Sequence, residues 1–477
     1  MFDPAKTSVV ERRRFITGAV GIATAGMLGV RSGEAQTVAP TAIPIPTRIQ
    51  TPDLAFADPL LQLRNAWAEA KGADDVILSI VPAEPASDQL LTDARSGTQR
   101  FSGAIVPNWL IPDLVRDAFI TPLTAPPEPL PASITQLRSF GGQWVAADLD
   151  HDCDLLFYRQ DLLDHANLTP AETWDDLLQQ CTTRSTERIG SIALPVTHAQ
   201  QVVDHYVSMA APYVLAGTAP AKFWFDEESM EPVIDSGAHR QALETWLALS
   251  QTTPEILRGG STGDLWQALL DGSVAYLVAS ADFLPFALDQ GIDPGVLGIA
   301  RLPGVRTDDG TVARAGNVTG ASWGGVVMSS ASEQASGESA DLLRTFAQTG
   351  SQQALWTNQA SGIIPAPVTT TDIESFSAQL ASAGWDAAIS TRWLQALQAT
   401  FGDPVQLAPL RIAETRRYLD ALERRIVALL SGVGSSAAEA LDLAAQDWRA
   451  INNEIDIEVQ RALFAQSLMP PPHEQQS

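Results

Sequence analysis

Alternating carboxylates form the densest group of side chains in this sequence that could do chemistry. Asp148, Asp150 and Asp152 fall within five residues, with His151 among them and Asp154 two residues further on. So many acceptor oxygens close together could bind the hydroxyls of a sugar or polyol. They could also ligate a hard cation such as Ca²⁺, although the twelve-residue loop with its central glycine and closing glutamate is missing. A third interpretation is an exposed acidic turn without a ligand.

Paired carboxylates can also serve a glycosidase as proton donor and nucleophile. Such pairs are frequent in a chain with 56 Asp and Glu residues, so this interpretation ranks below the others. The two cysteines form no C-x-x-C pair, and no H-E-x-x-H motif of a zinc helix occurs. We therefore expect no enzyme, no catalytic residue, no metal and no cofactor.

Polar and aromatic residues next to strand ends are further candidates for contacts with a ligand. Asn108 and Trp109 follow an apolar strand, and Trp323 precedes a glycine pair that begins with Gly324. Flat apolar rings suit the C–H surface of a sugar, and glycines let a ligand approach the backbone. Each of these rings could instead belong to the core.

Trp224 and Asp282 complete the candidate set. Trp224 lies between Phe223 and Phe225, so packing in the core explains it at least as well, whereas Asp282 follows directly after an apolar strand. No cluster of Arg or Lys that would clamp a phosphate or carboxylate is visible. A neutral polyhydroxylated ligand, or a cation, therefore suits these residues better than an anion.

Charge and length exclude several classes of protein. With 30 Lys and Arg against 56 Asp and Glu, the net charge is −26, which argues against binding to nucleic acid or to an anionic membrane surface. An apolar fraction of 45% with 18% charged residues is typical of a globular chain. A length of 477 residues corresponds to about two domains.

The first residues predict an export signal over 1–35. A basic stretch at Arg12-Arg13-Arg14 is followed by an apolar run from Gly18 to Val30 and by small residues up to Ala35. The run is too short to span a bilayer of roughly 30 Å, which argues against an uncleaved anchor. The order Arg-Arg-x-Phe-Ile resembles twin-arginine signals. We expect a periplasmic or otherwise extracytoplasmic protein, with a Pro- and Thr-rich tether over 36–46.

Short apolar runs alternate with helical patterns in the mature chain. This alternation predicts an α/β fold with mixed or parallel sheets flanked by helices. From Ser332 onward the pattern is almost entirely helical, and 466–477 is a polar, Pro-rich tail that we expect to be disordered. The expected strands are 76–81, 103–107, 154–158, 273–279, 296–300 and 322–328.

Cys153 and Cys181 are the only cysteines. In an oxidising compartment they could form a disulfide, which would stabilise the fold by roughly 3–4 kcal/mol in the chain-entropy model. Two separately buried thiols are the alternative.

Six short stretches, in this order along the chain, resemble family 1 extracellular solute-binding proteins, the maltodextrin-binding-like receptors of ABC importers. The second stretch ends in Tyr-Arg-x-Asp-Leu, and in it His151 replaces the glycine of an Asp-Gly-Asp motif that is common in the family. The sixth stretch lacks the Arg that usually follows it in the family. The stretches are 103–123, 150–162, 173–177, 298–304, 321–326 and 363–366.

The resemblance implies a two-lobed periplasmic-binding-protein fold with a hinge between the lobes and a helical C-terminal part. We expect the first lobe to comprise 47–155 plus 290–330, and the second 156–289 plus 331–465. Ligand would be held in the cleft without chemistry. The residues expected to contact it are Asn108, Trp109, Asp148, Asp150, Asp152, Trp224, Asp282, Trp323 and Gly324.

The implied function is capture of a small ligand, above all a carbohydrate or polyol, by hinge closure and delivery to the permease of an ABC importer. The protein would act as a monomer and without nucleic acid. The alternatives are a periplasmic binding protein outside transport, for a metal or another small ligand, and a sugar-processing enzyme.

Overall fold

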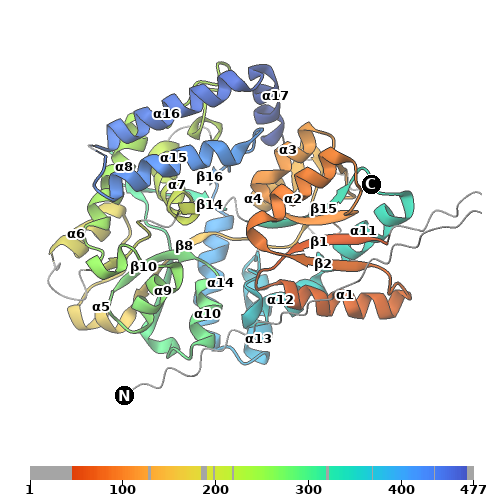
Figure 1. The fold of residues 1–477 in the computed structure, drawn as a ribbon. Coiled ribbons are helices and arrows are strands. Elements are labelled where there is room, and N and C mark those ends of the chain that lie inside the picture. Colours follow the sequence, from red (N-terminus) through yellow and green to blue (C-terminus); the bar gives the residue numbers. More distant parts are fainter. Residues whose placement is uncertain are drawn as a thin grey trace, which may run out of the picture. The chain divides into compact units, whose positions relative to one another are not determined.

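The computed structural model describes residues 46–126, 130–183, 191–196, 199–216, 220–318, 322–367, 369–434 and 436–469. The predicted export signal, the tether up to residue 45 and the end of the predicted tail lie outside the described residues. The described chain belongs to one unit, 46–477, and builds two sheets that are each covered by helices (Figure 1).

The first sheet has the strand order β2-β1-β3-β15-β4, with β7 also paired to β15. The neighbours β2, β1 and β3 run parallel because helices connect them, whereas β15 returns antiparallel to β3, β4 and β7. Its strands are β1 (Arg48–Pro52), β2 (Ile77–Val81), β3 (Gly103–Pro107), β4 (Ile120–Thr121), β7 (Ala147–Asp148) and β15 (Trp323–Met328).

Both faces of the first sheet are apolar, as expected when helices cover both. Along β3, Ile105 belongs to the core cluster under α1 (Ala57–Lys71) and α11 (Glu333–Phe346). Its neighbours Ala104 and Val106 belong to the cluster under α2 (Ala83–Ser96).

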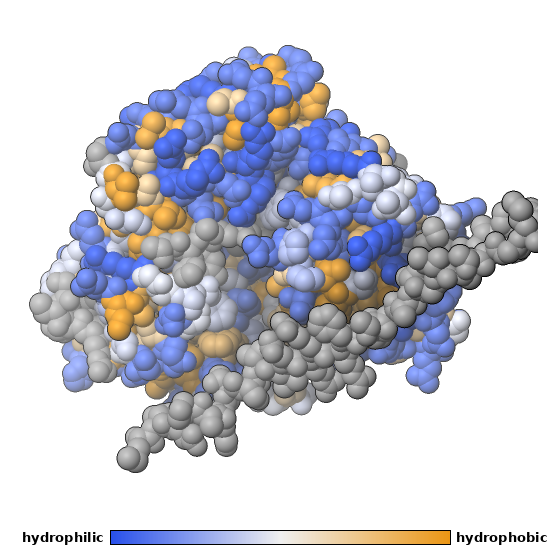
Figure 2. Space-filling view, in the orientation of Figure 1, coloured by the Kyte–Doolittle hydropathy of each residue, from blue (hydrophilic) through white to orange (hydrophobic). Residues whose placement is uncertain are grey.

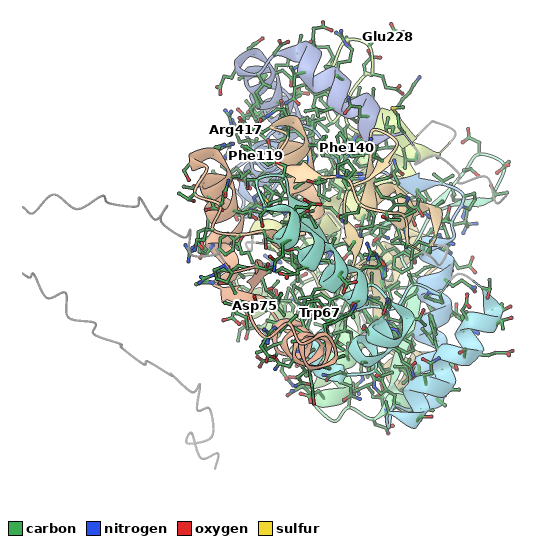
Figure 3. All side chains as sticks on the ribbon, turned by 90° about the vertical axis from the view of Figure 1, so that its right-hand side faces the viewer. Trp67, Asp75, Phe119, Phe140, Glu228 and Arg417 are labelled. Carbon is green, nitrogen blue, oxygen red and sulfur yellow. The ribbon has the colours of Figure 1, made fainter. Side chains whose placement is uncertain are left out.

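One tertiary hydrogen bond and one glycine help to fix the helices over this sheet. Trp67 on α1 donates from Nε1 to the carboxylate of Asp341 on α11 at 3.0 Å, which ties the two helices together (Figure 3). Gly72 ends α1 in the left-handed conformation that favours glycine. Helices α12 (Thr349–Trp356), α3 (Ile111–Arg116) and α4 (Ala132–Arg138) complete the cover.

The second sheet has the order β11-β8-β10-β9, and its central strand β8 (Asp154–Arg159) runs antiparallel to both neighbours. Gly298 of β11 lies opposite Tyr158 of β8, and a Cβ at this glycine would come within 1.9 Å of the tyrosine ring. The other strands are β9 (Ile192–Ala193), β10 (Tyr276–Ser280) and β11 (Leu297–Arg301).

Helices cover the second sheet on both faces, because successive side chains of β8 are apolar and point to opposite faces. Leu156 and Tyr158 belong to the core cluster under α7 and α8, while Leu155 and Phe157 belong to the one under α9, α10 and α14. The bounds are α5 (Gln160–Ala166), α6 (Trp174–Thr183), α7 (Ala199–Leu215), α8 (Gly237–Ser250), α9 (Thr262–Leu270), α10 (Phe283–Asp289), α13 (Thr370–Ser382), α14 (Ala387–Phe401), α15 (Thr415–Leu430), α16 (Ala437–Glu454) and α17 (Ile457–Ser467).

The chain crosses between the sheets more than once. It leaves β7 for β8 through residues 149–153, and it returns from β11 to β15 through residues 302–322. After α12 it passes back, since α14 packs on β11. Short pairs of strands lie along these connections: β5 (Ser139–Phe140) with β6 (Gln143–Trp144), β12 (Val305–Arg306) with β13 (Val312–Ala313), and β14 (Gly316–Asn317) with β16 (Gln406–Leu407).

The division into lobes that we expected from the sequence differs in three places from the strand pairing and helix packing of the structure. Strand β11, expected in the first lobe, pairs with β8 in the second sheet. Helices α11 and α12, expected in the second lobe, cover the first sheet, because Leu343 and Phe346 pack in its core cluster. Helix α17, expected in the second lobe, also contacts α3 and β5 of the first lobe. It ends at Ser467, so the first two residues of the tail expected over 466–477 are helical.

Hydrophilic residues predominate over the outer helices on the face shown in Figure 2, with apolar residues in smaller patches between them. Among the described residues, no helix combines the length and apolar character that a membrane crossing requires. Two of the exposed large apolar side chains, Ile77 and Ile80, lie together on the edge strand β2. The others among the described residues lie far apart in the sequence: Ile256, Val433, Ile457 and Met469.

Candidate functional site

Arg138 is the centre of a buried polar network at the first crossing between the lobes. Its side chain is 0% exposed and stands at the end of α4. The guanidinium donates from Nε to Asp148 at 2.8 Å, from Nη1 to the side-chain oxygen of Asn108, and from Nη2 to the carbonyl of Asp150. One cation therefore fastens the 3-10 helix η1 (Asn108–Leu110), strand β7 and the crossing segment to each other.

His151 holds the other side of this network. Its Nε2 lies 2.6 Å from Asp148 Oδ2, and its Nδ1 lies 2.9 Å from the carbonyl oxygen of Ile364. Burial alone would raise the pKa of Asp148, but the charges and hydrogen bonds of His151 and Arg138 outweigh burial and hold that pKa at about 2. Because both partners of the imidazole are then acceptors, both ring nitrogens must donate, and the buried ring carries a positive charge.

Four of the residues expected to contact a ligand lie in this network. Asn108 and Asp148 are directed at Arg138, and the backbone at Gly324 leaves room for the guanidinium, whose Nη1 would lie 3.2 Å from an added Cβ. The carboxylate of Asp150 accepts from the backbone N–H of Ile364, and burial raises its pKa to about 6. These groups position the crossing segment.

A second group of carboxylates follows along the same segment. Asp152 accepts from the Ser280 hydroxyl at 2.6 Å, and Asp282 lies close enough to the same serine to interact with it. Burial, together with the charge of Asp282, raises the pKa of Asp152, and burial also raises that of Asp282. The structure thus brings the predicted residues Asp152 and Asp282 together at the edge of β10.

Asp154 continues this group into the second lobe. Its Oδ1 lies 2.9 Å from His205 Nδ1 on α7, and its backbone N–H donates to Asn317 at 2.7 Å. Within the described part of the chain, no three His, Cys, Asp or Glu side chains are arranged to hold a metal ion. The cation interpretation of the acidic stretch therefore gains no support from the geometry.

A narrow hollow lies where η1 of the first lobe meets α7 and α15 of the second. Trp109 contributes the first-lobe wall, and its side chain is half-buried. Aliphatic residues and a second tryptophan make up most of the opposite wall. The residues of that wall are Asp204, Val207, Ser208, Trp224, Val318, Leu407, Pro409, Leu410 and Leu419.

Asp204 provides the charge of this hollow. It is half-buried on α7, and its carboxylate has no hydrogen-bond or ion-pair partner among the described residues. The neighbouring Ser208 already donates its hydroxyl to the backbone carbonyl of Asp204 at 2.9 Å. Sequence reasoning missed both residues. The signal was an acidic residue and a serine one turn apart within the mainly apolar part of α7 that begins at Val202.

The three candidate tryptophans have different surroundings. Trp224 is 2% exposed, donates from Nε1 to the carbonyl of Ala408 at 2.7 Å, and packs in the core with one part lining the hollow. Trp323 packs edge-on against Phe56 with 5.7 Å between the ring centroids, and it does not line the hollow. Trp109 and Trp323 are both half-buried, and Trp109 is the one of these two that lines the hollow.

Both cysteines are free and buried, which corresponds to the second of the two alternatives stated for them. Cys153 lies in the core cluster that extends along both sheets, and Cys181 lies in the cluster around α7 and α8. A disulfide would need the two thiols to share one site in the core.

A stretch with the spacing G-x-S-x-G occurs at 259–263, and this spacing is also found around the nucleophile of some hydrolases. Here Ser261 is the N-cap of α9, and its hydroxyl donates to the Asp264 carboxylate at 2.8 Å. A capping box accounts for the motif, and no strand leads into it.

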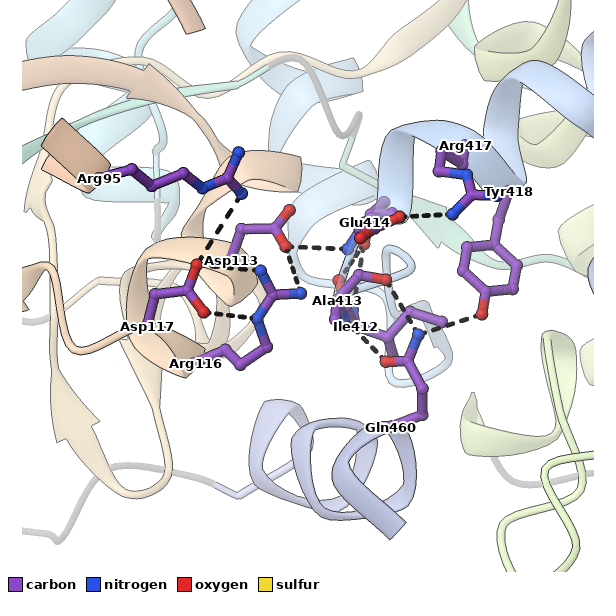
Figure 4. A network of polar contacts seen from close by, with 11 residues as sticks. Arg95, Asp113, Arg116, Asp117, Ile412, Ala413, Glu414, Arg417, Tyr418 and Gln460 are labelled. Atoms are coloured by element: carbon purple, nitrogen blue, oxygen red, sulfur yellow. Dashed lines mark hydrogen bonds and ion pairs between the residues drawn. The ribbon is translucent and has the colours of Figure 1, made fainter. Parts of the chain in front are cut away.

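Direct contacts between the lobes lie next to the hollow (Figure 4). The backbone N–H of Glu414, at the start of α15, donates to Asp113 of α3 at 3.0 Å. Gln460 of α17 exchanges two hydrogen bonds with the backbone of Ala413, at 2.9 and 3.0 Å. The buried guanidinium of Arg411 stacks over Phe140 at 5.0 Å. The segment that precedes α15 is therefore anchored to the first lobe.

Solved structures of solute-binding proteins share this fold. A maltose-bound MalE3 from T. maritima has a TM-score of 0.68 at 17% identity, over 85% of this chain and 100% of that chain. An ABC transporter solute-binding protein from Agrobacterium radiobacter K84 in complex with ribitol has a TM-score of 0.68 at 15% identity, over 85% and 98%. The sugar-binding protein MalE from Xanthomonas citri has a TM-score of 0.67 at 16% identity, over 86% and 97%.

No family model and no curated protein sequence matches the chain. The structural matches confirm the two-lobed fold that the six sequence stretches predicted.

Proposed function

We propose that this protein is an extracytoplasmic solute-binding protein that captures a carbohydrate or polyol between its lobes and delivers it to an ABC importer. The fold is shared with proteins solved with maltose, ribitol, tagatose and mannitol. The observation that carries the proposal is the hollow between η1 and α7, where Trp109 from one lobe faces a wall from the other.

The composition of the hollow suits such a ligand. A sugar presents apolar C–H faces and polar edges, so it needs an aromatic face together with a few placed polar groups. Trp109 supplies the face, and Asp204 supplies acceptor oxygens that no other described residue uses.

Binding would couple to lobe closure. Because the two walls belong to different lobes, a ligand that touches both binds the closed state more tightly and shifts the population toward it. The crossing segments at 149–153 and 302–318 would bend, while the network around Arg138 keeps the first of them attached to its lobe. The closed state is the form that a permease would recognise.

We further propose export by the predicted twin-arginine signal, action as a monomer, and binding without turnover. The carboxylates of the crossing segment support the last point. Asp148 is paired with two cations, and Asp152 is engaged by Ser280, so neither is free to serve as a glycosidase acid or nucleophile.

A thermal-shift screen of the purified protein with sugars, polyols and sugar acids, with divalent cations in parallel, tests this function. A ligand at about 100 times its dissociation constant should stabilise the folded state by about 2.7 kcal/mol, a shift of a few degrees. A shift with a sugar or polyol supports the proposal. A shift with cations alone, or turnover of the bound sugar, would refute it.

A further inference from the structure

We propose that the hollow takes a ligand with a protonated amine, so that the natural solute is an aminated sugar or polyol rather than a neutral one. This inference rests on the proposed function and narrows its substrate class. It is carried by the position of the Asp204 carboxylate beside two tryptophans in a hollow whose described lining contains no basic side chain.

The carboxylate of Asp204 has no hydrogen-bond or ion-pair partner among the described residues, although the charges of His205 and Arg416 act on it and favour its charged form. The nearby cations are engaged elsewhere: Arg416 pairs with Asp420 at 2.7 Å, and His205 pairs with Asp154 at 2.9 Å. Burial, and then the charge of Asp154, raises the pKa of Asp204 to about 7. A carboxylate in this position gains more from a cation than one that already has a partner.

Further carboxylates strengthen the preference for positive charge. Glu423 on α15 is 6% exposed, its Oε2 has no hydrogen-bond partner among the described residues, and its charge also acts on Asp204. Carboxyl groups of both α7 and α15 therefore act on each other near the hollow, and burial raises the pKa of each to about 7, so a bound cation would favour the charged form of both. A neutral hydroxyl would satisfy the hydrogen bond of Asp204 but would leave this negative potential in place.

The tryptophans favour the same ligand. The face of an indole ring attracts an ammonium group within about 6 Å, and it does so more strongly when water is excluded. Trp109 lines the hollow from the first lobe and is half-buried, so closure would bring its ring near the group that Asp204 binds, while the buried Trp224 contributes only the edge of the opposite wall. The hydroxyls and C–H faces of the remaining scaffold would occupy the rest of the cleft.

Calorimetric titration with matched sets tests the inference near neutral pH. One set is D-glucosamine, N-acetyl-D-glucosamine and D-glucose, a second is the galactose series, and a third is glucamine with sorbitol. We expect the amine of at least one set to bind about tenfold or more tightly than its neutral partners. If neutral members bind equally well or better, the inference fails while the proposed function stands. If no member binds although another sugar or polyol gives a thermal shift, the inference fails while the proposed function stands, and if no sugar or polyol binds in either experiment, both fail.

Asp204→Asn provides the matched variant. It keeps the size of the side chain and removes the charge, so the amine should lose more affinity than its neutral partner and the preference for the amine should disappear. Thermal melting verifies that the variant folds, which we expect because no described group depends on this carboxylate for a hydrogen bond. An unchanged amine preference in the variant would overturn the assignment to Asp204.

Discussion

The imidazole of His151 lies 2.6 Å from the carboxylate of Asp148, and both side chains are buried where the chain first crosses between the lobes. Arg138 pairs with the other oxygen of the same carboxylate at 2.8 Å. One buried anion therefore lies between two cations. This arrangement fixes the start of a crossing segment that would have to bend during closure, and it explains why His151 stands where a glycine would give more backbone freedom.

Asp148→Asn should be strongly destabilising, since it leaves two buried cations without their anion. We expect a loss of about 3–5 kcal/mol in the free energy of unfolding. Because the pKa of Asp148 is lowered to about 2, its contribution is present above the ordinary value of 3.8 and is lost as the pH falls toward 2. Denaturant unfolding measures the loss, with the exposed Asp308→Asn as the control that changes it by less than about 0.5 kcal/mol. Equal effects of the two substitutions would contradict the network.

His151 predicts the opposite pH dependence. Burial would lower its pKa, but the Asp148 carboxylate outweighs burial and raises that pKa above 6.5. A raised pKa in the folded state means that the contribution of His151 is fully present below 6.5 and is lost as the pH rises through the raised value. The difference in unfolding free energy between the wild type and His151→Gln should therefore shrink toward alkaline pH. A difference that stays constant would show that the ring is neutral throughout.

Gly298 is required by the register of the second sheet. A Cβ there would come within 1.9 Å of the Tyr158 ring, so Gly298→Ala should force the strand or the ring to move and cost about 1–3 kcal/mol. Gly337→Ala is the matched control, because this glycine lies inside α11 with no atom near the added Cβ, and the exchange should stabilise by about 0.5–1 kcal/mol. Thermal melting of both variants compares them, and a stable Gly298→Ala would contradict the pairing of β11 with β8.

Both thiols should be free and slow to react. Burial raises the pKa of Cys181 to about 12 and also raises that of Cys153, so little thiolate is present in the native protein. A thiol-reactive dye should label two cysteines after denaturation without reductant and far less than one in the native state over the same time. Failure to find two thiols in the denatured, unreduced protein would establish the disulfide instead.

The sequence allowed the type of fold to be predicted, because its strands and their flanking motifs are local. Topology was harder. No local pattern within residues 297–301 indicates that this strand pairs with β8. The pairing depends on the contact between Gly298 and Tyr158, which lies 140 residues earlier in the chain. The helices after Ser332 have similar amphipathic patterns, so their assignment to one lobe or the other depends on packing that no local pattern encodes.

The candidate site was predicted only in part. Trp109 was found because it follows a strand end, and the acidic stretch was found because its carboxylates alternate. The pairing of Asp148 with Arg138 spans ten residues and two elements, so its structural role was hidden. Asp204 lies inside a helix without a motif, and only the three-dimensional approach of α7 to η1 gives it a function.

The most direct test of this account is a calorimetric titration of the wild type and of Trp109→Ala with the sugar or polyol that gives the largest thermal shift. Trp109 is half-buried and makes no hydrogen bond through its ring, so the variant should fold. We predict one-to-one binding to the wild type and an affinity lower by about tenfold or more in the variant, because the stacking surface is lost. Equal affinities, or the absence of binding to the wild type, would contradict the assignment of this hollow as the solute-binding site.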